Sequence, residues 1–178
     1  MSSTNTASDE LRHSLTKYYY HFDGKIPAIE SVKNLLTKVL EDLRYDLLAS
    51  ITHIDGGTML TAAARRGDTE MCVTLLLSLP PADRLKLILV NKYTALHLAA
   101  FQGYTETVSG ILSCLTADQQ LQLICTQNSF GDTALHDAAS KGRTETVKNL
   151  LDIITPEQQL KLLSVQNKEG KTASQEAA

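Results

Sequence analysis

The chain contains the stretch Thr94-Ala-Leu-His-Leu-Ala-Ala-Phe-Gln-Gly103, which recurs as Thr133-Ala-Leu-His-Asp-Ala-Ala-Ser-Lys-Gly142 and as Thr58-Met-Leu-Thr-Ala-Ala-Ala-Arg-Arg-Gly67. A fourth copy begins at Thr172 and runs to Ala178. The four threonines are separated by 36, 39 and 39 residues. Self-similarity at such a spacing is typical of repeat proteins, in which each unit packs mainly against its neighbours. The sequence therefore predicts a stack of about four units.

Each unit has the pattern of a helix, a turn and a second helix. The threonine can cap the first, alanine-rich helix by accepting a hydrogen bond from a free backbone amide. The glycine can end that helix in a left-handed conformation. The second helix begins at a Thr-Glu pair, which places an acid near its positive end. Its apolar residues follow helical spacing, as in Val147, Leu150, Leu151 and Ile154.

A third short helix is predicted in each unit. Thr116-Ala-Asp-Gln119 and Thr155-Pro-Glu-Gln158 each have a threonine at the cap position and glutamine three residues later. This is the pattern of a capping box, and proline suits the first turn of a helix. Leu79-Pro-Pro-Ala82 is a weaker version of the same signal. Polar turns that contain glycine then lead to the next threonine at Asn128–Thr133 and Asn167–Thr172.

The Thr-x-Leu-His-x-Ala-Ala-x-x-Gly pattern resembles the ankyrin repeat over about residues 30–178. The resemblance implies an all-α solenoid, in which a turn called a finger precedes two antiparallel helices. The chain departs from the family in its longer period, 39 residues against about 33. The proline of the family motif is replaced by Met59, Ala95, Ala134 and Ala173. The turn at 91–94 is two residues shorter than the later ones, so we expect a truncated finger there with its neighbours displaced.

The repeat pattern also divides the chain into units. Glu30-Ser-Val-Lys-Asn-Leu-Leu36 matches Glu145-Thr-Val-Lys-Asn-Leu-Leu151, so a degenerate unit precedes the first full one. We predict a solenoid at 29–178, with partial units at 29–53 and 167–178 and full units at 54–90, 91–127 and 128–166. Residues 1–28 are predicted to combine a disordered start, to about residue 8, with an N-terminal cap.

The N-terminal segment carries two further predictions. Residues 11–22 have the pattern of a short helix, and residues 29–50 that of one amphipathic helix. We interpret this block as a helical cap that shields the first full unit. The run Tyr18-Tyr19-Tyr20 leaves open a separate docking or dimer surface.

Composition restricts the class of function. The chain has 178 residues, 43% hydrophobic and 21% charged, with a net charge of −3. A weakly acidic chain disfavours nucleic acid and anionic membranes as ligands, because both reward clustered Lys and Arg. The polar start lacks the features of a secretory signal, and no apolar run approaches a membrane span. Three cysteines without a C-x-x-C pair suit a reducing compartment.

The resemblance assigns partner contacts to finger tips and to the last exposed positions of the inner helices. Four aromatic residues, Tyr93, Phe101, Tyr104 and Phe130, map to these regions, and exposed aromatics are typical of interface hot spots. An alternative is that these rings only pack on neighbouring units. The predicted contact residues are Arg65, Arg66, Lys92, Tyr93, Phe101, Gln102, Tyr104, Ser129, Phe130, Asp132 and Lys141. The resemblance assigns further positions of this kind to the flanking residues Ile54, Asp55, Gly57, Ser140, Lys168, Glu169 and Lys171.

Catalytic and metal-binding alternatives are weaker. His97 and His136 recur at one repeat position, and the resemblance makes them structural ties to the threonine and the adjacent loop. The structural motif residues are Thr58, Thr94, His97, Gly103, Thr133, His136 and Gly142. Cys72 and Cys114 are predicted to be buried core thiols. Glu169-Gly-Lys-Thr172 ends like a phosphate loop, but Val165 stands where the first glycine is required.

The sequence thus predicts a non-enzymatic protein that binds another protein through a concave face, as an adaptor or targeting module. It predicts a monomer in the cytoplasm or nucleus, with no cofactor and no metal. One alternative is an uncharacterised enzyme on this scaffold. Another is a fragment of a larger signalling protein or enzyme, whose activity lies outside this chain.

Overall fold

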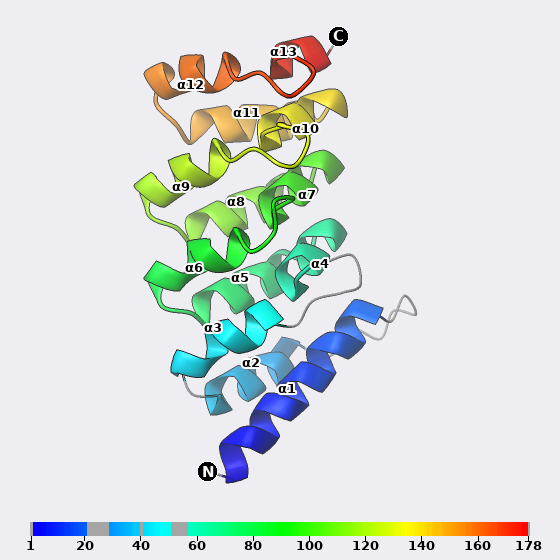
Figure 1. Ribbon diagram of the computed structural model, residues 1–178, viewed down its shortest axis with the longest axis vertical. Helices are drawn as coiled ribbons and strands as arrows, with labels where there is room; N and C mark the ends of the chain where they lie inside the picture. The colour runs from blue at the N-terminus through cyan, green and yellow to red at the C-terminus, as the bar shows by residue number, and fades with distance from the viewer. Residues whose placement is uncertain (1, 21–28, 40, 51–56, 178) are drawn as a thin grey trace.

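The computed structural model describes residues 2–20, 29–39, 41–50 and 57–177, which form a stack of short helices (Figure 1). The N-terminal helices are α1 (Ser2–Tyr20), α2 (Ile29–Lys38) and α3 (Glu41–Ser50). Three sets of three follow: α4 (Met59–Arg66), α5 (Thr69–Leu77), α6 (Pro81–Ile88), α7 (Ala95–Gln102), α8 (Thr105–Ser113), α9 (Ala117–Ile124), α10 (Ala134–Ser140), α11 (Thr144–Asp152) and α12 (Pro156–Leu163). The last helix is α13 (Ala173–Glu176). The predicted all-α repeat architecture is confirmed.

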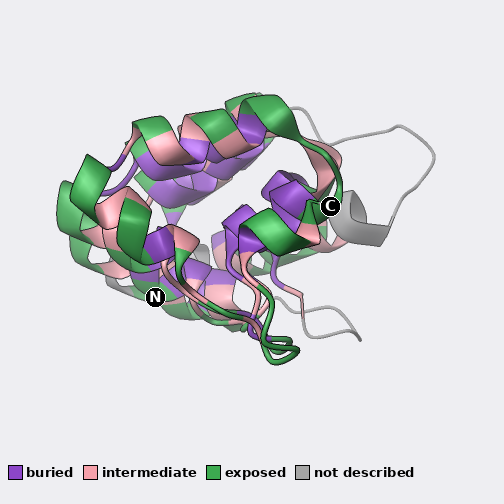
Figure 2. Cartoon of the chain, turned by 90° about the horizontal axis from the view of Figure 1, so that it is seen from above, coloured by how far each residue is buried: buried purple, intermediate pink, exposed green. Residues whose placement is uncertain are grey.

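The helices form three rows along the stack. Helices α4, α7, α10 and α13 pack on one another in an inner row, and α5, α8 and α11 do so in an outer row. The predicted third helices, α6, α9 and α12, make a further row on the left of Figure 1. Seen from above, buried residues gather where inner and outer rows face each other, and the connecting fingers project to one side (Figure 2). The extra helix accounts for the period of 39 residues.

Local signals set the ends of these helices, as predicted. Gly67 and Gly103 adopt positive φ angles of 73° and 83° after α4 and α7, where a left-handed residue closes the helix. Thr116 and Gln119 form a reciprocal capping box at the start of α9, and Thr155 begins α12 in the same way. Helix α6 has proline in its first turn and lacks a side-chain cap, as the weaker motif indicated.

The third helices are held to the outer row by one repeated side-chain position. Arg44, Arg84, Gln120 and Gln159 each stand at the fourth residue of their helix and each donate to the carbonyl five residues earlier. The two arginines also reach the next unit: Arg44 Nη1 donates to the Ser78 carbonyl and Arg84 Nη1 to the Cys114 carbonyl, both at 3.0 Å. The two glutamines instead donate a second bond within their own unit.

The outer row is joined by threonine pairs. Thr69 Oγ1 bonds Thr107 Oγ1 at 2.8 Å, and Thr105 bonds Thr146 in the same way one unit later. Gly110 of α8 faces α5, where an added Cβ would stand 2.8 Å from the Thr69 methyl group. Small and polar residues therefore allow adjacent outer helices to approach closely.

The N-terminal segment differs from the prediction in two respects. The expected single helix at 29–50 is two helices, and α3 packs against α6 as the third helix of its own unit. The residues before Glu41 lack a capping motif, so apolar periodicity alone did not mark the break. The start expected to be disordered is helical instead, because α1 begins at Ser2.

Helix α1 packs against α2 and α4. Ala7, Leu11 and Leu15 lie one turn apart on its face and are all buried. An N-terminal helix therefore covers the exposed side of α4, and the N-terminal unit contains more than the half repeat at 29–53. Only the backbone of α1 is described at Tyr18–Tyr20, so the prediction for that run lies outside the described side chains.

Candidate functional site

His97 of α7 and His136 of α10 each tie their own inner helix to the finger that follows it. Nδ1 of His97 bonds Thr94 Oγ1 at 2.8 Å, and Nε2 lies 3.0 Å from the Asp132 carbonyl. His136 repeats this with Thr133 at 2.9 Å and with the Lys171 carbonyl at 3.2 Å. Burial lowers the pKa of His97 to about 4, so its ring is neutral at physiological pH. The two rings position the fingers that follow their helices.

The third and fourth fingers are two matching hairpin turns. Asn128 Oδ1 accepts hydrogen bonds from the amides of Phe130 and Asp132, and Asn167 Oδ1 does the same for Glu169 and Lys171. The two fingers are joined where the Lys168 amide donates to the Phe130 carbonyl at 3.0 Å. Segment 168–172, which ends like a phosphate loop in sequence, is therefore part of a finger.

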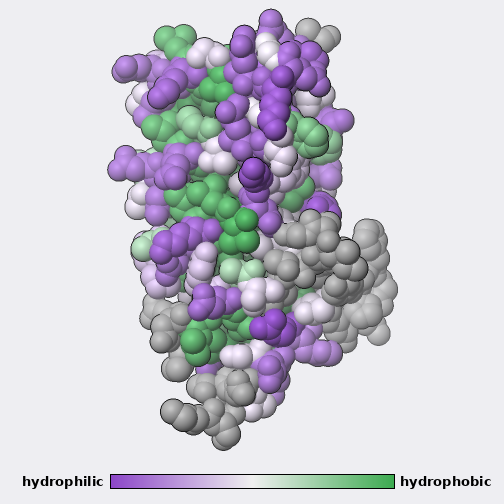
Figure 3. Space-filling view, viewed as in Figure 1, coloured by the Kyte–Doolittle hydropathy of each residue, from purple (hydrophilic) through white to green (hydrophobic). Residues whose placement is uncertain are grey.

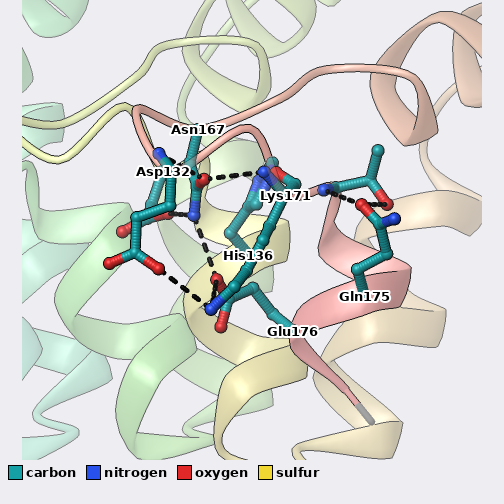
Figure 4. A network of polar contacts seen from close by, with 8 residues as sticks. Asp132, His136, Asn167, Lys171, Gln175 and Glu176 are labelled. Carbon is teal, nitrogen blue, oxygen red and sulfur yellow. Dashed lines mark hydrogen bonds and ion pairs between the residues drawn. The ribbon is translucent and has the colours of Figure 1, made fainter.

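A network of polar side chains anchors the fourth finger to the inner row (Figure 4). Asn167 Nδ2 donates to Asp132 Oδ1 at 2.8 Å and to Glu176 Oε1 at 3.0 Å. Lys171 Nζ lies 2.9 Å from Glu169 Oε2 and 3.7 Å from Glu176 Oε1. Gln175 replaces the histidine of the earlier units, and its side chain accepts from the Thr172 amide at 2.9 Å.

Fingers and inner helices enclose a hollow of about 530 Å³, here named the C-terminal hollow. It is built from three consecutive units. Its aromatic lining comes from Tyr93, Phe101 and Phe130, and its charged lining from Asp132, Asp137, Lys141, Lys168, Glu169, Lys171 and Glu176. Phe130 is 67% exposed, and Lys141 Nζ lies 4.7 Å from the centre of the Phe101 ring.

A second hollow of about 330 Å³, the N-terminal hollow, lies on the other side of Tyr93. Its lining includes Gly57, Arg65, Lys92 and Ser129. Tyr93 lines both hollows, so they form neighbouring parts of one concave face. Nine predicted contact or flanking residues line the C-terminal hollow: Tyr93, Phe101, Phe130, Asp132, Ser140, Lys141, Lys168, Glu169 and Lys171.

The remaining predicted contact residues lie elsewhere. Arg66, Gln102 and Tyr104 line neither hollow, and the Tyr104 ring packs against Gly67 of the preceding unit. Tyr104 nevertheless remains 39% exposed. Ile54 and Asp55 lie outside the described residues, as does the displacement expected for their finger.

Asp137 is a site residue that the sequence prediction missed. It is 7% exposed, and its Oδ1 accepts a hydrogen bond from the Tyr93 hydroxyl at 3.2 Å. Burial raises its pKa to about 7, although the Tyr93 and Asn128 side chains act in the opposite direction. Alignment of the units carries a signal: Ala62 and Leu98 occupy this position in the first two full units, whereas the later units have the acids Asp137 and Glu176 there.

The thiols have the environment of core residues. Cys72 is fully buried and Cys114 is 5% exposed, as predicted. Burial raises the pKa of both thiols, which disfavours the reactive thiolate. Within the described ranges, no group of three or more side chains is suited to hold a metal ion. No helix there combines the length and the apolar character needed to span a bilayer.

Comparison with known proteins agrees with the repeat geometry. A family model for three copies of the ankyrin repeat matches residues 27–123, and a single-repeat model matches residues 130–155. A search among curated proteins gave no match. Because the first match alone covers more than half of the sequence, and the capped helix pairs stack as repeats, the chain belongs to the ankyrin-repeat family.

Proposed function

We propose that this chain is an adaptor or targeting module that binds a partner protein through its concave face. Ankyrin repeats are in general protein–protein interaction modules and are typically not enzymes. The proposal therefore concerns which surface binds, and it assigns that role to the two hollows beside Tyr93.

One observation carries the assignment. Phe130 extends a largely exposed ring beside the C-terminal hollow, and Phe101 lies half-buried in the same lining. Exposed aromatic rings beside a concave surface are costly to hydrate and release free energy when a partner covers them. Aromatic anchors of this kind dominate binding energy at many interfaces.

Hydrogen bonds hold the fingers that line the C-terminal hollow in place. Its fingers are fixed by the His97 and His136 bonds and by the Asn128 and Asn167 turns. A pre-ordered surface loses little conformational entropy when it binds, which favours affinity. We further propose that the chain is a monomer and acts in the cytoplasm or nucleus. Cys72, Cys114 and Cys125 form no disulfide, which supports a reducing compartment.

The test compares partner capture by the wild-type chain with capture by Phe101→Ala and Phe130→Ala. Leu160→Ala is the matched control, because Leu160 is 72% exposed on α12, away from both hollows. Affinity purification with crosslinking and mass spectrometry should identify proteins retained by wild type and the control but lost from the two variants. Retention of the same proteins by all four chains would place binding on another surface.

A further inference from the structure

The carboxylates that line the C-terminal hollow are already engaged within the chain. Asp132 and Glu176 accept hydrogen bonds from Asn167, and Glu169 pairs with Lys171. Asp137 accepts from Tyr93 and is buried, and its raised pKa reduces its negative charge near neutral pH. Each of these carboxylates therefore already has a hydrogen-bond or ion-pair partner within the chain.

Three lysines of the concave face differ from these carboxylates, because they have no ion-pair partner among the described residues. No carboxylate of the described residues lies within 4.0 Å of the ammonium group of Lys92, Lys141 or Lys168. Lys92 is in the N-terminal hollow, whose lining contains no acidic side chain among the residues that the structure describes. Lys141 and Lys168 are exposed at the C-terminal hollow. A chain with a net charge of −3 thus presents unpaired cations on this face.

One exposed apolar ring, that of Phe130, lies in the same hollow as Lys141 and Lys168. Figure 3 shows mainly hydrophilic side chains at the upper end of the stack, over α13 and the fourth finger, whereas hydrophobic ones gather at mid-height on the side of the outer and third helices. Within the C-terminal hollow the exposed Phe130 ring is the main exception. A ligand that suits this hollow therefore combines negative charge with one apolar group.

We infer that the occupant of the concave face is an extended acidic segment of a partner protein, with carboxylates at Lys92, Lys141 and Lys168 and an apolar side chain on Phe130. This inference rests on the proposed function, because it specifies the chemistry of the partner for the same surface. Charge complementarity of this kind steers association and selects among partners.

The size of the segment follows from the stack. Packed helices lie ~10 Å apart, and an extended chain advances ~3.3 Å per residue, so about three residues cross each unit. The two hollows draw on units from Gly57 to Glu176. A segment of about ten residues therefore reaches from Lys92 to Lys168 and beyond.

Random peptides of about twelve residues, displayed on phage and selected on the full chain, provide the test. The enriched peptides should combine Asp or Glu with an aromatic or aliphatic residue. Their affinity should fall about 100-fold in the double variant Lys141→Glu/Lys168→Glu, because two attractions become repulsions. Lys148→Glu, an exposed residue of α11 outside both hollows, is the matched charge control and should leave the affinity unchanged.

Several outcomes would overturn the inference: no enrichment, neutral or basic enriched peptides, or equal binding by the double variant. Lysine-dependent binding of a short single-stranded RNA or of phosphatidylserine vesicles, without peptide binding, would also overturn it. The proposed function has a separate test. Protein capture that depends on Phe101 and Phe130 but is insensitive to charge reversal would support concave-face binding and refute the acidic segment.

Discussion

The Tyr93 hydroxyl donates a hydrogen bond to Asp137 Oδ1, across 44 positions of sequence and from one repeat unit to the next. The Tyr93 ring also stacks on His97, with ring centres 5.6 Å apart. The truncated second finger is therefore held in place by the inner helices of its own and the following unit. Two buried groups with shifted pKa values, Asp137 and His97, lie at this junction.

Asp137 should make stability fall as pH rises. Its pKa is about 7 in the folded chain against 3.8 in the unfolded one, so the folded state holds the proton more tightly. The contribution is fully present below about pH 4 and is lost progressively up to about pH 7. Denaturant unfolding of wild type and Asp137→Asn should show wild type losing stability relative to the variant over this window. If the stability of the two chains changed with pH in parallel, a raised pKa of Asp137 would be contradicted. Tyr93→Phe removes a hydrogen bond that lowers this pKa, so it should shift the midpoint of the stability loss to higher pH.

His97 should act in the opposite direction. Its folded pKa of about 4 lies below the unfolded value of 6.5, so stability is lost as pH falls from 6.5 towards 4. His97→Gln should lower stability at pH 7 by about 1–2 kcal/mol through lost hydrogen bonds, yet remove this loss at acid pH. Gln175 already occupies the equivalent position in the last unit, so glutamine fits the backbone there. A variant whose acid sensitivity matches wild type would show that His97 is not buried as a neutral ring.

Arg84 should couple neighbouring units. Arg84→Gln keeps the type of bond that Gln120 and Gln159 make within their own units but loses the bond to the Cys114 carbonyl. We expect a loss of about 1–2 kcal/mol in unfolding free energy, since hydrogen bonds to charged donors contribute about that much. The reciprocal variant Gln120→Arg is the control, and it should be neutral or stabilising. Equal stability of wild type and Arg84→Gln would show that the bridge between units contributes nothing.

Gly131 and Gly142 should differ sharply in their tolerance of alanine. Both have positive φ, but a Cβ at Gly131 would stand 2.7 Å from the Lys168 amide nitrogen, whereas Gly142 has nothing within 4 Å. Gly142→Ala should cost about 1–2 kcal/mol from backbone strain alone. Gly131→Ala should cost more and should separate the third finger from the fourth, which amide hydrogen exchange at Lys168 would detect. Equal costs would mean that the two fingers are not packed together.

Leu11 should show whether α1 covers the stack. The side chain is fully buried between α1 and its neighbours, so Leu11→Ala should cost about 2–5 kcal/mol. Glu10→Ala changes an exposed residue of the same helix and should stay within about 0.5 kcal/mol of wild type. Thermal unfolding of both variants gives the comparison. A small effect at Leu11, or an unchanged melting temperature after deletion of residues 1–29, would refute the capping role.

Short-range signals were sufficient for most of the fold. Thr94 and Gly103 bracket α7, and Thr155 with Gln158 begins α12, because caps act within three or four residues of the chain. The break between α2 and α3 was missed where such a signal is lacking. The apolar spacing of residues 29–50 predicts one helix, whereas the structure has α2 and α3 there, with α3 packed against α6.

Among the candidate site residues, Phe101, Phe130 and Lys141 line one hollow, because equivalent positions of stacked units face the same side. The register could not separate Tyr104, which turns onto Gly67, from the residues that line the hollow. The repeat register also did not predict the hydrogen bond between the Tyr93 hydroxyl and Asp137.

The sequence by itself therefore determined the ankyrin units and their third helices, since each depends on residues a few positions apart. Only the tertiary structure decided which carboxylates are engaged by Asn167, Tyr93 and Lys171 and which lysines stay unpaired. The bonds of Tyr93 to Asp137 and of Asn167 to Asp132 join side chains of different units, so they follow from how the units stack, which no local pattern specifies.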